Sequence, residues 1–192
     1  MISQSITDKQ REILNAALKL FVENGFHATP TSMIAKEAGV ANGTLFHYYK
    51  TKDELIVALY TEIKTGLSKC ILTGDTEGET MKDKWKRYFT TAIEWGVDNP
   101  KEFRFAQQFV SSPYLAMVSD ELKKHSQLTI DLIKEGIKAK ILKPHEPELL
   151  NTILTSCVYA VNQYIVDSKL TYPERKKVIN KSFDMLWSMM AV

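Results

Sequence analysis

Residues 42–52, with the sequence NGTLFHYYKTK, gather side chains that can contact a polyanion. Asn42 and Gly43 stand at the expected start of a short helix, where free backbone N–H groups favour a phosphate. Polar-tipped side chains follow closely, and two lysines come after them: Thr44, His47, Tyr48, Lys50 and Lys52. Lysines neutralise phosphates whatever the sequence, whereas polar side chains on a helix can reach base edges. This stretch therefore predicts contact with a nucleic acid.

Two short helices are needed to position this stretch. The first is expected to have Thr29 as its N-cap and Pro30 at its first position, and to stop at Gly39. The second is expected over 42–49. Gly39 permits the positive φ of a tight turn, and the apolar residues suited to a shared core are Ile34, Val40 and Leu45. This is the layout of a helix-turn-helix unit, whose second helix enters a major groove.

Spacing alone leaves a structural alternative open. A short helix pair with a glycine turn also occurs in all-α proteins that never contact DNA. The aromatic residues of 46–49 could equally form a core wedge, and His47 could be an ordinary surface histidine. Residues 1–52 carry six Lys and Arg and four Asp and Glu, so the chain's whole net charge of +2 lies in this part. That excess is consistent with DNA binding but is small.

Helices are also predicted directly before and after this unit. No run of alternating apolar residues predicts a strand. Thr7 and Gln10 form a capping box before an apolar face that ends at Asn24–Gly25. The residues expected on that face are Ile13, Leu14, Ala17, Leu18, Phe21 and Val22. Thr51 and Glu54 form another box before a helix that is expected to turn inward Leu55, Ile56, Leu59, Tyr60, Ile63 and Leu67.

The rest of the chain reads as a loop over 73–80 followed by further helices. Asn99–Pro100 and Ser112–Pro113 each look like an N-cap followed by proline at the first helical position. Pro144 and Pro147 interrupt the chain after a helix ending near Leu142, and Thr171–Glu174 starts the last helix. The sequence predicts an all-α fold of about nine helices, four short ones and then five mostly longer ones.

Composition bounds the class of protein. The chain has 192 residues, 44% hydrophobic and 25% charged, which is enough apolar material for a core and excludes a disordered or fibrous chain. Cys70 and Cys157 are too few and too far apart for a disulfide scaffold or a thiolate zinc site. The first ten residues do not resemble a signal peptide. The uncharged run 149–166 carries polar residues that are costly in lipid, so we expect a buried helix, no membrane span and a cytoplasmic protein.

The second half of the chain offers a candidate pocket and a candidate interface. Aromatic residues with a few polar groups suit a mainly apolar small-molecule pocket, although for any single residue an ordinary core position is the favoured alternative. The candidates are Trp85, Phe89, Phe103, Phe109, Tyr114, Met117, Tyr159, Asn162 and Gln163. The last two helices, expected over 147–169 and 173–190, carry more bulky apolar residues than one buried face accommodates. A second copy of the chain would cover them, which predicts a homodimer.

No catalytic, metal or cofactor site is predicted. Among the four histidines, only His125 shares an i, i+4 helical face with a carboxylate, Glu121, and one such pair is too few ligands for a metal. No GxSxG, HExxH or GxxxxGKS pattern occurs.

Residues 11–55 resemble the N-terminal domain of TetR-family transcriptional regulators. The matching segments are AALKLFVENGF, IAKEAGV and GTLFHYYKTKDEL. The resemblance implies an all-α homodimer with a three-helix DNA-binding domain over 1–52 and a larger effector-binding and dimerisation domain over 53–192, linked by a helix over 51–72. It also implies dimerisation through the last two helices and lowered operator affinity when a small effector binds.

The resemblance also implies roles for particular residues. Ser32 matches a position near a phosphate at the start of the second helix, Thr44 the polar residue after glycine in the recognition helix, and Lys52 a phosphate-binding lysine. His47 and Tyr48 match the groove-facing pair. The sequence departs from the family pattern at three positions, where Ala41 replaces a common serine and Phe46 and Tyr49 replace a common tyrosine and phenylalanine.

Together these features predict a DNA-binding regulator, a repressor released from a near-palindromic operator by a mainly apolar effector. A helical ligand-binding or adaptor module without sequence-specific DNA binding is the alternative.

Overall fold

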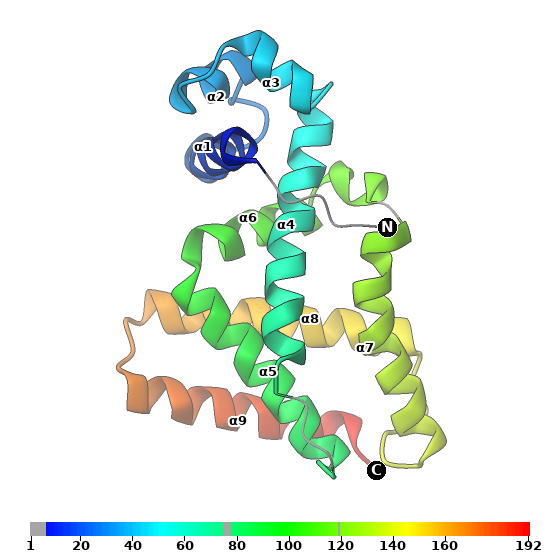
Figure 1. The fold of residues 1–192 in the computed structure, drawn as a ribbon. Helices are drawn as coiled ribbons and strands as arrows, with labels where there is room; N and C mark the ends of the chain where they lie inside the picture. The colour runs from blue at the N-terminus through cyan, green and yellow to red at the C-terminus, as the bar shows by residue number, and fades with distance from the viewer. Residues whose placement is uncertain (1–6, 75–77, 119) are drawn as a thin grey trace. The chain divides into compact units, whose positions relative to one another are not determined.

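The computed structural model describes residues 7–74, 78–118 and 120–192, without the side chains of 120–126 and 128. Over these ranges the chain forms nine α-helices and one 3-10 helix, with no strand beyond a single bridge between Leu142 and Ala191. The predicted all-α fold is confirmed. In chain order (Figure 1) the helices are α1 (Asp8–Asn24), α2 (Thr31–Glu37), α3 (Asn42–Tyr48), α4 (Lys52–Leu72), α5 (Met81–Asp98), α6 (Pro100–Val110), η1 (Pro113–Met117), α7 (Asp120–Lys138), α8 (Pro147–Asp167) and α9 (Tyr172–Met190).

The lengths of the first helices differ from the prediction of four short ones. α2 and α3 have seven residues each, but α1 has 17 and α4 has 21. Neither long helix contains a proline, and each carries an apolar stripe along its length, so nothing in its sequence ends it early.

α1 begins and ends where its sequence predicts. Thr7 Oγ1 accepts a hydrogen bond from the Gln10 N–H at 3.3 Å, and Gln10 Oε1 accepts one from the Thr7 N–H at 3.1 Å. Gly25 follows the helix with a φ of +78°, a conformation that glycine adopts without strain. The buried face consists of Ile13, Leu14, Ala16, Ala17, Leu18, Leu20 and Phe21, whereas Val22, expected there, is half-buried.

The chain divides into two compact units. The first comprises Met1–Lys64 and Pro100–Val118, and the second comprises Thr65–Asn99 and Ser119–Val192. The first unit contains all of residues 1–52 and extends beyond them with the first part of α4, α6 and η1. α4 contributes to both units.

Aromatic packing explains why α6 belongs to the first unit despite its distance in sequence. The ring of Phe105 lies 6.1 Å from that of Phe21 on α1 and 5.6 Å from that of Phe26, measured between centroids. Tyr60 of α4 stacks on Phe109 of α6 with centroids 3.9 Å apart and planes 8° from parallel. Such ring pairs add to the burial of apolar area.

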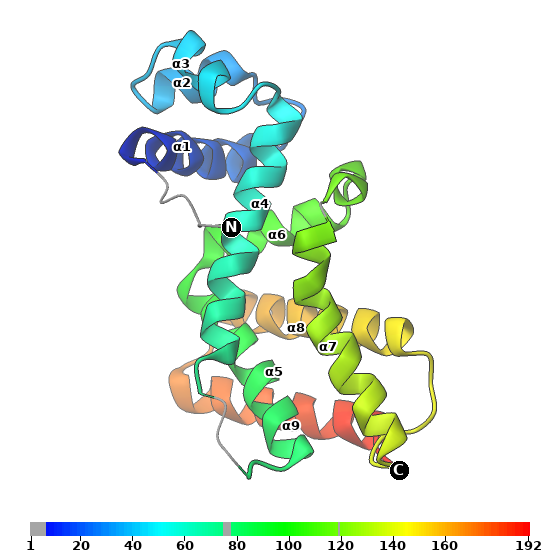
Figure 2. The same ribbon diagram turned by 45° about the vertical axis from the view of Figure 1, so that its right-hand side comes forward.

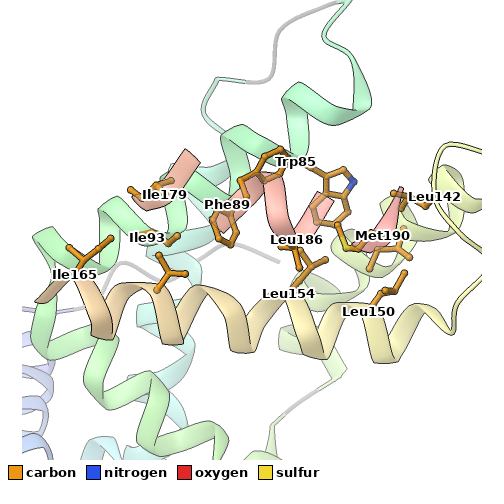
Figure 3. Close-up of a cluster of buried hydrophobic side chains, with 13 residues drawn as sticks. Trp85, Phe89, Ile93, Leu142, Leu150, Leu154, Ile165, Ile179, Leu186 and Met190 are labelled. Atoms are coloured by element: carbon orange, nitrogen blue, oxygen red, sulfur yellow. The ribbon is translucent and has the colours of Figure 1, made fainter. Parts of the chain in front are cut away.

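The second unit is built around α5, which packs against both α8 and α9. α8 and α9 lie side by side in both views (Figure 1, Figure 2). Figure 3 shows the core that these helices share with α7 and the segment after it. Its buried side chains are Trp85, Phe89, Ile93, Ile133, Leu142, Leu150, Leu154, Val161, Ile165, Ile179, Phe183, Leu186 and Met190.

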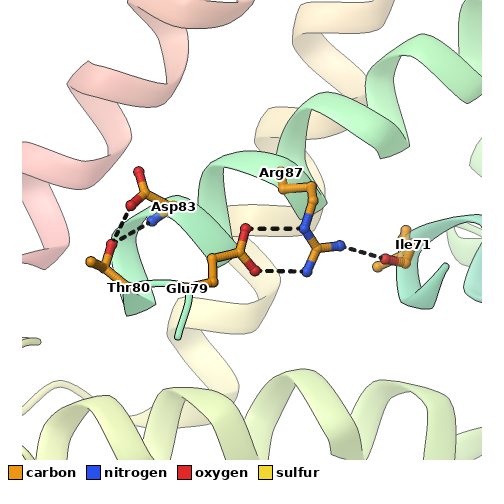
Figure 4. A network of polar contacts seen from close by, with 5 residues as sticks. All are labelled: Ile71, Glu79, Thr80, Asp83 and Arg87. Carbon is orange, nitrogen blue, oxygen red and sulfur yellow. Dashed lines mark hydrogen bonds and ion pairs between the residues drawn. The ribbon is translucent and has the colours of Figure 1, made fainter. Parts of the chain in front are cut away.

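A polar network connects the end of α4 to the start of α5 within this unit (Figure 4). Arg87 donates hydrogen bonds to both carboxylate oxygens of Glu79, at 3.1 and 3.0 Å, and to the Ile71 carbonyl at 2.9 Å. Ile71 lies in the last turn of α4, where carbonyl oxygens lack helical partners. The loop predicted over 73–80 is confirmed at 73–74 and 78–80, and residues 75–77 lie outside the described residues.

Two predicted N-caps bind the preceding helix instead. Asn99 Nδ2 donates to the Trp95 carbonyl of α5 at 2.9 Å, and Ser112 Oγ donates to the Phe109 carbonyl of α6 at 2.7 Å. Each of these carbonyl oxygens also accepts the backbone N–H of the same residue, at 2.8 and 3.0 Å, so the short side chain reinforces a bond that ends the earlier helix. The prolines still start helices as predicted, although Pro113 starts a 3-10 helix.

Of two predictions about helix ends in the last part of the chain, one is confirmed and one is not. The capping box at Thr171 is confirmed, since the Glu174 carboxylate accepts from the Thr171 N–H at 2.9 Å and from its hydroxyl at 2.6 Å. α7 ends at Lys138 rather than near Leu142, because the Ile141 and Leu142 N–H groups both turn back to the Gly136 carbonyl.

Candidate nucleic-acid interface

α2 and α3 meet at a tight turn that includes Gly39. The Ala38 N–H donates to the Ile34 carbonyl at 2.9 Å, and the Val40 N–H donates to the Ala35 carbonyl at 3.0 Å. Gly39 has a φ of +66°, which side chains other than glycine rarely adopt. The shared core predicted for this pair is confirmed at Ile34 and Leu45, both fully buried, and Val40 is half-buried.

The prediction that Thr29 is the N-cap of α2, with Pro30 at the first helical position, is wrong. The N-cap of α2 is Pro30, and no side chain caps this helix. The Thr29 side chain is fully buried, and its hydroxyl contacts the carbonyl oxygens of Gly25 at 2.8 Å and Leu20 at 3.2 Å. The hydroxyl therefore satisfies the end of α1 and fixes the connection from α1 to α2.

α3 directs one side chain into the core and leaves the others facing outward. Leu45 is fully buried, Asn42, Gly43 and His47 are exposed, and Thr44 and Tyr48 are half-buried. Ala41 precedes the helix and has no hydroxyl, so no side chain caps α3. The outward side of α3 thus carries an amide, an imidazole and two hydroxyl groups.

Four residues with aromatic rings, at the end of α3 and just after it, have different surroundings. His47 and Tyr48 contact each other edge to face, with centroids 5.3 Å apart. Phe46 is 38% exposed and presents a ring without a hydroxyl. Tyr49 is buried, and this burial raises the pKa of its phenol. The aromatic wedge considered as an alternative is therefore formed by Tyr49 and not by its three neighbours.

The predicted lysines stand on either side of the start of α4. Lys50 is exposed, and Lys52 is half-buried as the first residue of the helix. The predicted capping box is only half correct. Thr51 Oγ1 accepts from the Glu54 N–H at 3.0 Å, but the Glu54 carboxylate accepts from the Lys50 N–H at 2.7 Å instead of the Thr51 N–H.

The exposed part of α2 adds a hydroxyl and further charge. Ser32 is exposed in the first turn, and Lys36 is exposed in the last. Glu37, next to Lys36, is paired with Lys19 of α1 at 2.6 Å, a contact that raises the pKa of the Lys19 ammonium. The Lys19 ammonium thus compensates the negative charge of Glu37, the residue next to Lys36.

Comparisons with known proteins agree with this geometry. Residues 13–59 match the family of bacterial regulatory proteins called the tetR family. The chain is 30% identical over 153 residues to the HTH-type transcriptional regulator RutR of Escherichia coli, covering 77% of this chain and 71% of RutR. It is 30% identical to a TetR family transcription regulator from Shewanella sp. PV-4, whose crystal structure superposes with a TM-score of 0.85 over 97% of this chain and all of that one.

The chain belongs to the TetR family. It is a helix-turn-helix DNA-binding transcriptional regulator. A likeness of fold extends to FadR of Bacillus subtilis in complex with stearoyl-CoA, at 21% identity and a TM-score of 0.70 over 93% of this chain and 97% of that one.

Four of the residues predicted to line an effector pocket lie in the first unit, and their surroundings differ. Phe103 and Phe109 are buried, and Phe109 carries the stacked Tyr60 ring. Tyr114 is half-buried and contacts Phe26 edge to face, with centroids 5.4 Å apart. Met117 is exposed.

The candidates of the second unit separate into core and surface. Trp85 and Phe89 lie in the hydrophobic core. Asn162 is buried, and its amide donates to the Ile93 carbonyl of α5 at 3.1 Å, which cross-links α8 to α5. Tyr159 is half-buried, whereas Gln163 is exposed and donates to Asp167 at 2.8 Å.

Metal-ligating side chains do not cluster in the part of the chain that the structure describes, where no group of three His, Cys, Asp or Glu could hold an ion. The side chains of Glu121 and His125, the one pair noted in the sequence, lie outside the described residues. TetR-family regulators are generally DNA-binding proteins without catalytic activity.

α8 differs from the buried helix that its uncharged sequence predicted. Among the described helices, it alone is long and apolar enough to cross a membrane. Only 28% of its most apolar 18-residue stretch is buried inside the protein. Core helices of proteins in water have the same length and composition. Its buried residues form one face, and the opposite face is open. The sequence could not show this, because an uncharged helix has no polar side to mark its exposed face.

Proposed function

We propose that the chain is a homodimeric repressor that places α3 of each subunit in a major groove of a near-palindromic operator and is released by a small effector. The observation that carries this proposal is the division of α3, which buries Leu45 and leaves polar side chains outward over two of its turns. A helix held by one core residue and free on its other sides suits insertion into a groove.

Each outward residue receives a role from its chemistry. Thr44, His47 and Tyr48 read base edges, with Tyr48 held in place by its contact with His47. Ser32, Lys50 and Lys52 bind phosphates, as do the backbone N–H groups of Asn42 and Gly43. Phe46 lacks the hydroxyl that would let it join the phosphate contacts.

The dimer face is proposed to consist of α8 and α9. Large apolar side chains stand exposed on both helices, including Leu149 at 53% and Met185 at 66%. Along α9 the face continues at helical spacing through Val178, Ser182, Met185 and Met189, and along α8 through Leu149, Thr152, Ser156, Ala160 and Gln163. None of these residues is charged. An uncharged surface of this kind on two adjacent helices suits a two-fold contact with a second copy.

The effector is proposed to be small and mainly apolar. The aromatic residues of α5 support this, although Trp85 and Phe89 have buried positions that also serve the core. FadR of Bacillus subtilis, which has the same fold, is in complex with stearoyl-CoA, a ligand with a long apolar acyl chain. A repressor of this type acts on DNA in the cytoplasm.

The test is selection of genomic fragments by the purified protein, followed by fluorescence anisotropy of the recovered fragments at several salt concentrations. We expect tight, salt-dependent binding that random duplex of the same length does not displace. Recovery of no preferred fragment would favour the alternative, a helical ligand-binding or adaptor module that does not recognise DNA sequence.

A further inference from the structure

Phe46 is the one outward side chain of α3 that has no polar group. Its ring is 38% exposed, whereas Leu45 is fully buried and Tyr49, just after the helix, is buried as well. Among the described residues no other aromatic ring pairs with that of Phe46, although His47 and Tyr48 pair with each other. The chain therefore anchors this helix through Leu45 and Tyr49 and leaves the Phe46 ring open to a partner from outside.

Helical geometry separates Phe46 from the hydroxyl groups of α3. Successive residues are about 100° apart around a helix axis, so Phe46 and Thr44 lie on opposite flanks of the buried Leu45. Residues four apart lie on the same flank. Tyr48 therefore lies with Thr44, and Phe46 lies with Asn42. The outward side of α3 thus has one flank with two hydroxyl groups and one flank with an apolar ring.

Gly43 leaves open space beside the Phe46 ring. It precedes Phe46 by three residues, and helical side chains lean toward the N-terminus, so the ring points toward this position. A Cβ added at Gly43 would meet no atom of the described residues within 4 Å, and the φ of Gly43 is not positive. Neither packing nor backbone conformation requires glycine here, although glycine destabilises a helix relative to alanine. An outside surface can therefore approach the ring closely over Gly43.

The major groove offers such a ring a single kind of partner among the base edges. Every base edge there presents hydrogen-bond donors or acceptors, and thymine alone adds an apolar group, its C5-methyl. A phenylalanine ring has no donor or acceptor to exchange with the polar groups. It stabilises a complex by removing the methyl group from water.

We infer that Phe46 is a specificity-determining residue, whose ring contacts the C5-methyl of a thymine in each half-site over the space left by Gly43. The inference rests on the proposed function, which places α3 in a major groove, and it assigns a base to one position of the operator. Thr44, His47 and Tyr48 recognise hydrogen-bonding edges, and Phe46 adds an apolar contact within the same half-site.

The test removes the methyl group alone. In a selected operator each thymine is replaced in turn by deoxyuridine, which keeps the base pair but lacks the C5-methyl, and affinity is measured by fluorescence anisotropy. At least one thymine of each half-site, at symmetry-related positions, should be sensitive to replacement. We expect a loss of about fourfold for one half-site and about fifteenfold for both, as the burial of one methyl group predicts.

Variants of Phe46 identify the residue that reads the methyl group. F46A should bind the thymine and deoxyuridine operators equally at that position and should keep any sensitivity at other thymines. F46L retains an apolar side chain and should keep part of the difference. L115A, at an exposed apolar residue of η1, is the control and should keep all of it. The ratio of the two affinities is the readout, because a general loss of stability or of phosphate contacts lowers both affinities alike.

The possible failures separate this inference from the proposed function. Sequence-specific binding without any thymine of this kind, or an unchanged ratio in F46A, overturns the inference and leaves the DNA-binding proposal standing. A loss in F46A that is equal on operator and random duplex also overturns it, since the ring would then contact sugars and not a base. Recovery of no preferred fragment overturns both.

Discussion

At the scale of single residues, the outward side of α3 offers two kinds of contact that experiment can separate. In the proposed complex, lysines at the start of α4 hold phosphates, which every duplex presents equally. Hydroxyl and imidazole groups on α3 are proposed to meet base edges, which differ from one sequence to the next. A variant's effect on operator and on random DNA therefore reveals which kind of contact the residue makes.

Lys52→Ala should weaken binding to operator and random duplex by the same factor. Each lost phosphate contact should lower the slope of log affinity against log salt by about 0.9. Anisotropy titrations at several salt concentrations measure both effects. Lys138→Ala, at an exposed lysine of α7 in the second unit, is the control and should leave the slope unchanged. A normal slope in Lys52→Ala would remove this residue from the contacts.

Tyr48→Phe should weaken binding to the operator more than to random duplex. A lost base contact costs about 1–3 kcal/mol on the operator, whereas random DNA offers no matching partner. Tyr49→Phe is the matched control, because Tyr49 is the buried neighbour and its hydroxyl faces no groove in the proposed complex. Equal losses on both duplexes would mean that Tyr48 only positions the protein.

Residue-level prediction of helix caps from sequence succeeded at Thr7 and Thr171 and failed at three other positions. Thr7 caps α1 as predicted, through its capping box with Gln10. Thr29, Asn99 and Ser112 each stand between two helices, and each binds the end of the earlier one. Sequence spacing does not show which helix a short polar side chain will reach.

At the scale of elements, the close approach of two segments determines which substitutions the fold tolerates there. The α1–α2 connection depends on one buried hydroxyl, and the end of α7 depends on a glycine. Both features lie outside the proposed contacts with DNA, so their variants should change stability before they change recognition.

Thr29→Val should destabilise the first unit by about 1–3 kcal/mol, since it leaves the Gly25 carbonyl oxygen without the hydroxyl donor that lies 2.8 Å away. Chemical unfolding followed by circular dichroism measures the change. Thr29→Ser keeps the hydroxyl and should lose less stability. If Thr29→Val unfolds like the wild type while Thr29→Ser is destabilised, the methyl group and not the hydrogen bond stabilises this connection.

Gly136→Ala should destabilise the second unit by about 1–3 kcal/mol through overpacking. An added Cβ would lie 2.7 Å from Leu142 Cδ1 and 2.8 Å from Met81 Sδ, and Leu142 is fully buried and cannot move aside. Gly66→Ala is the contrasting variant, because no atom lies within 4 Å of the added Cβ. It should leave stability unchanged or raise it by about 0.5–1 kcal/mol. Equal unfolding midpoints for the two variants would show that α7 tolerates the added atom.

At the scale of the whole molecule, the sequence indicated a partner for α8 and α9 because it holds more apolar residues than one buried face can use. It did not show which residues stay open. That division depends on α5, which covers one side of both helices and leaves Leu149, Met185 and Met189 exposed. The proposed dimer face follows from that packing.

Met185→Glu should shift the protein from dimer to monomer, because two-fold symmetry brings the new carboxylates into one interface without counter-ions. Sedimentation velocity measures the shift, and operator affinity should fall with it. Leu115→Glu, at an exposed apolar residue of η1, is the control and should remain dimeric. A Met185→Glu protein that stays dimeric would place the interface elsewhere.

The most direct measurement of the central claim is a hydroxyl-radical footprint of the protein on a selected fragment. Two recognition helices related by a two-fold axis should protect two half-sites on one face of the duplex, with centres about 34–36 Å apart or a little more. The protected sequences should be related by near-dyad symmetry, and Tyr48→Phe should weaken both half-sites together. A single protected patch, or uniform protection along the fragment, would contradict the account.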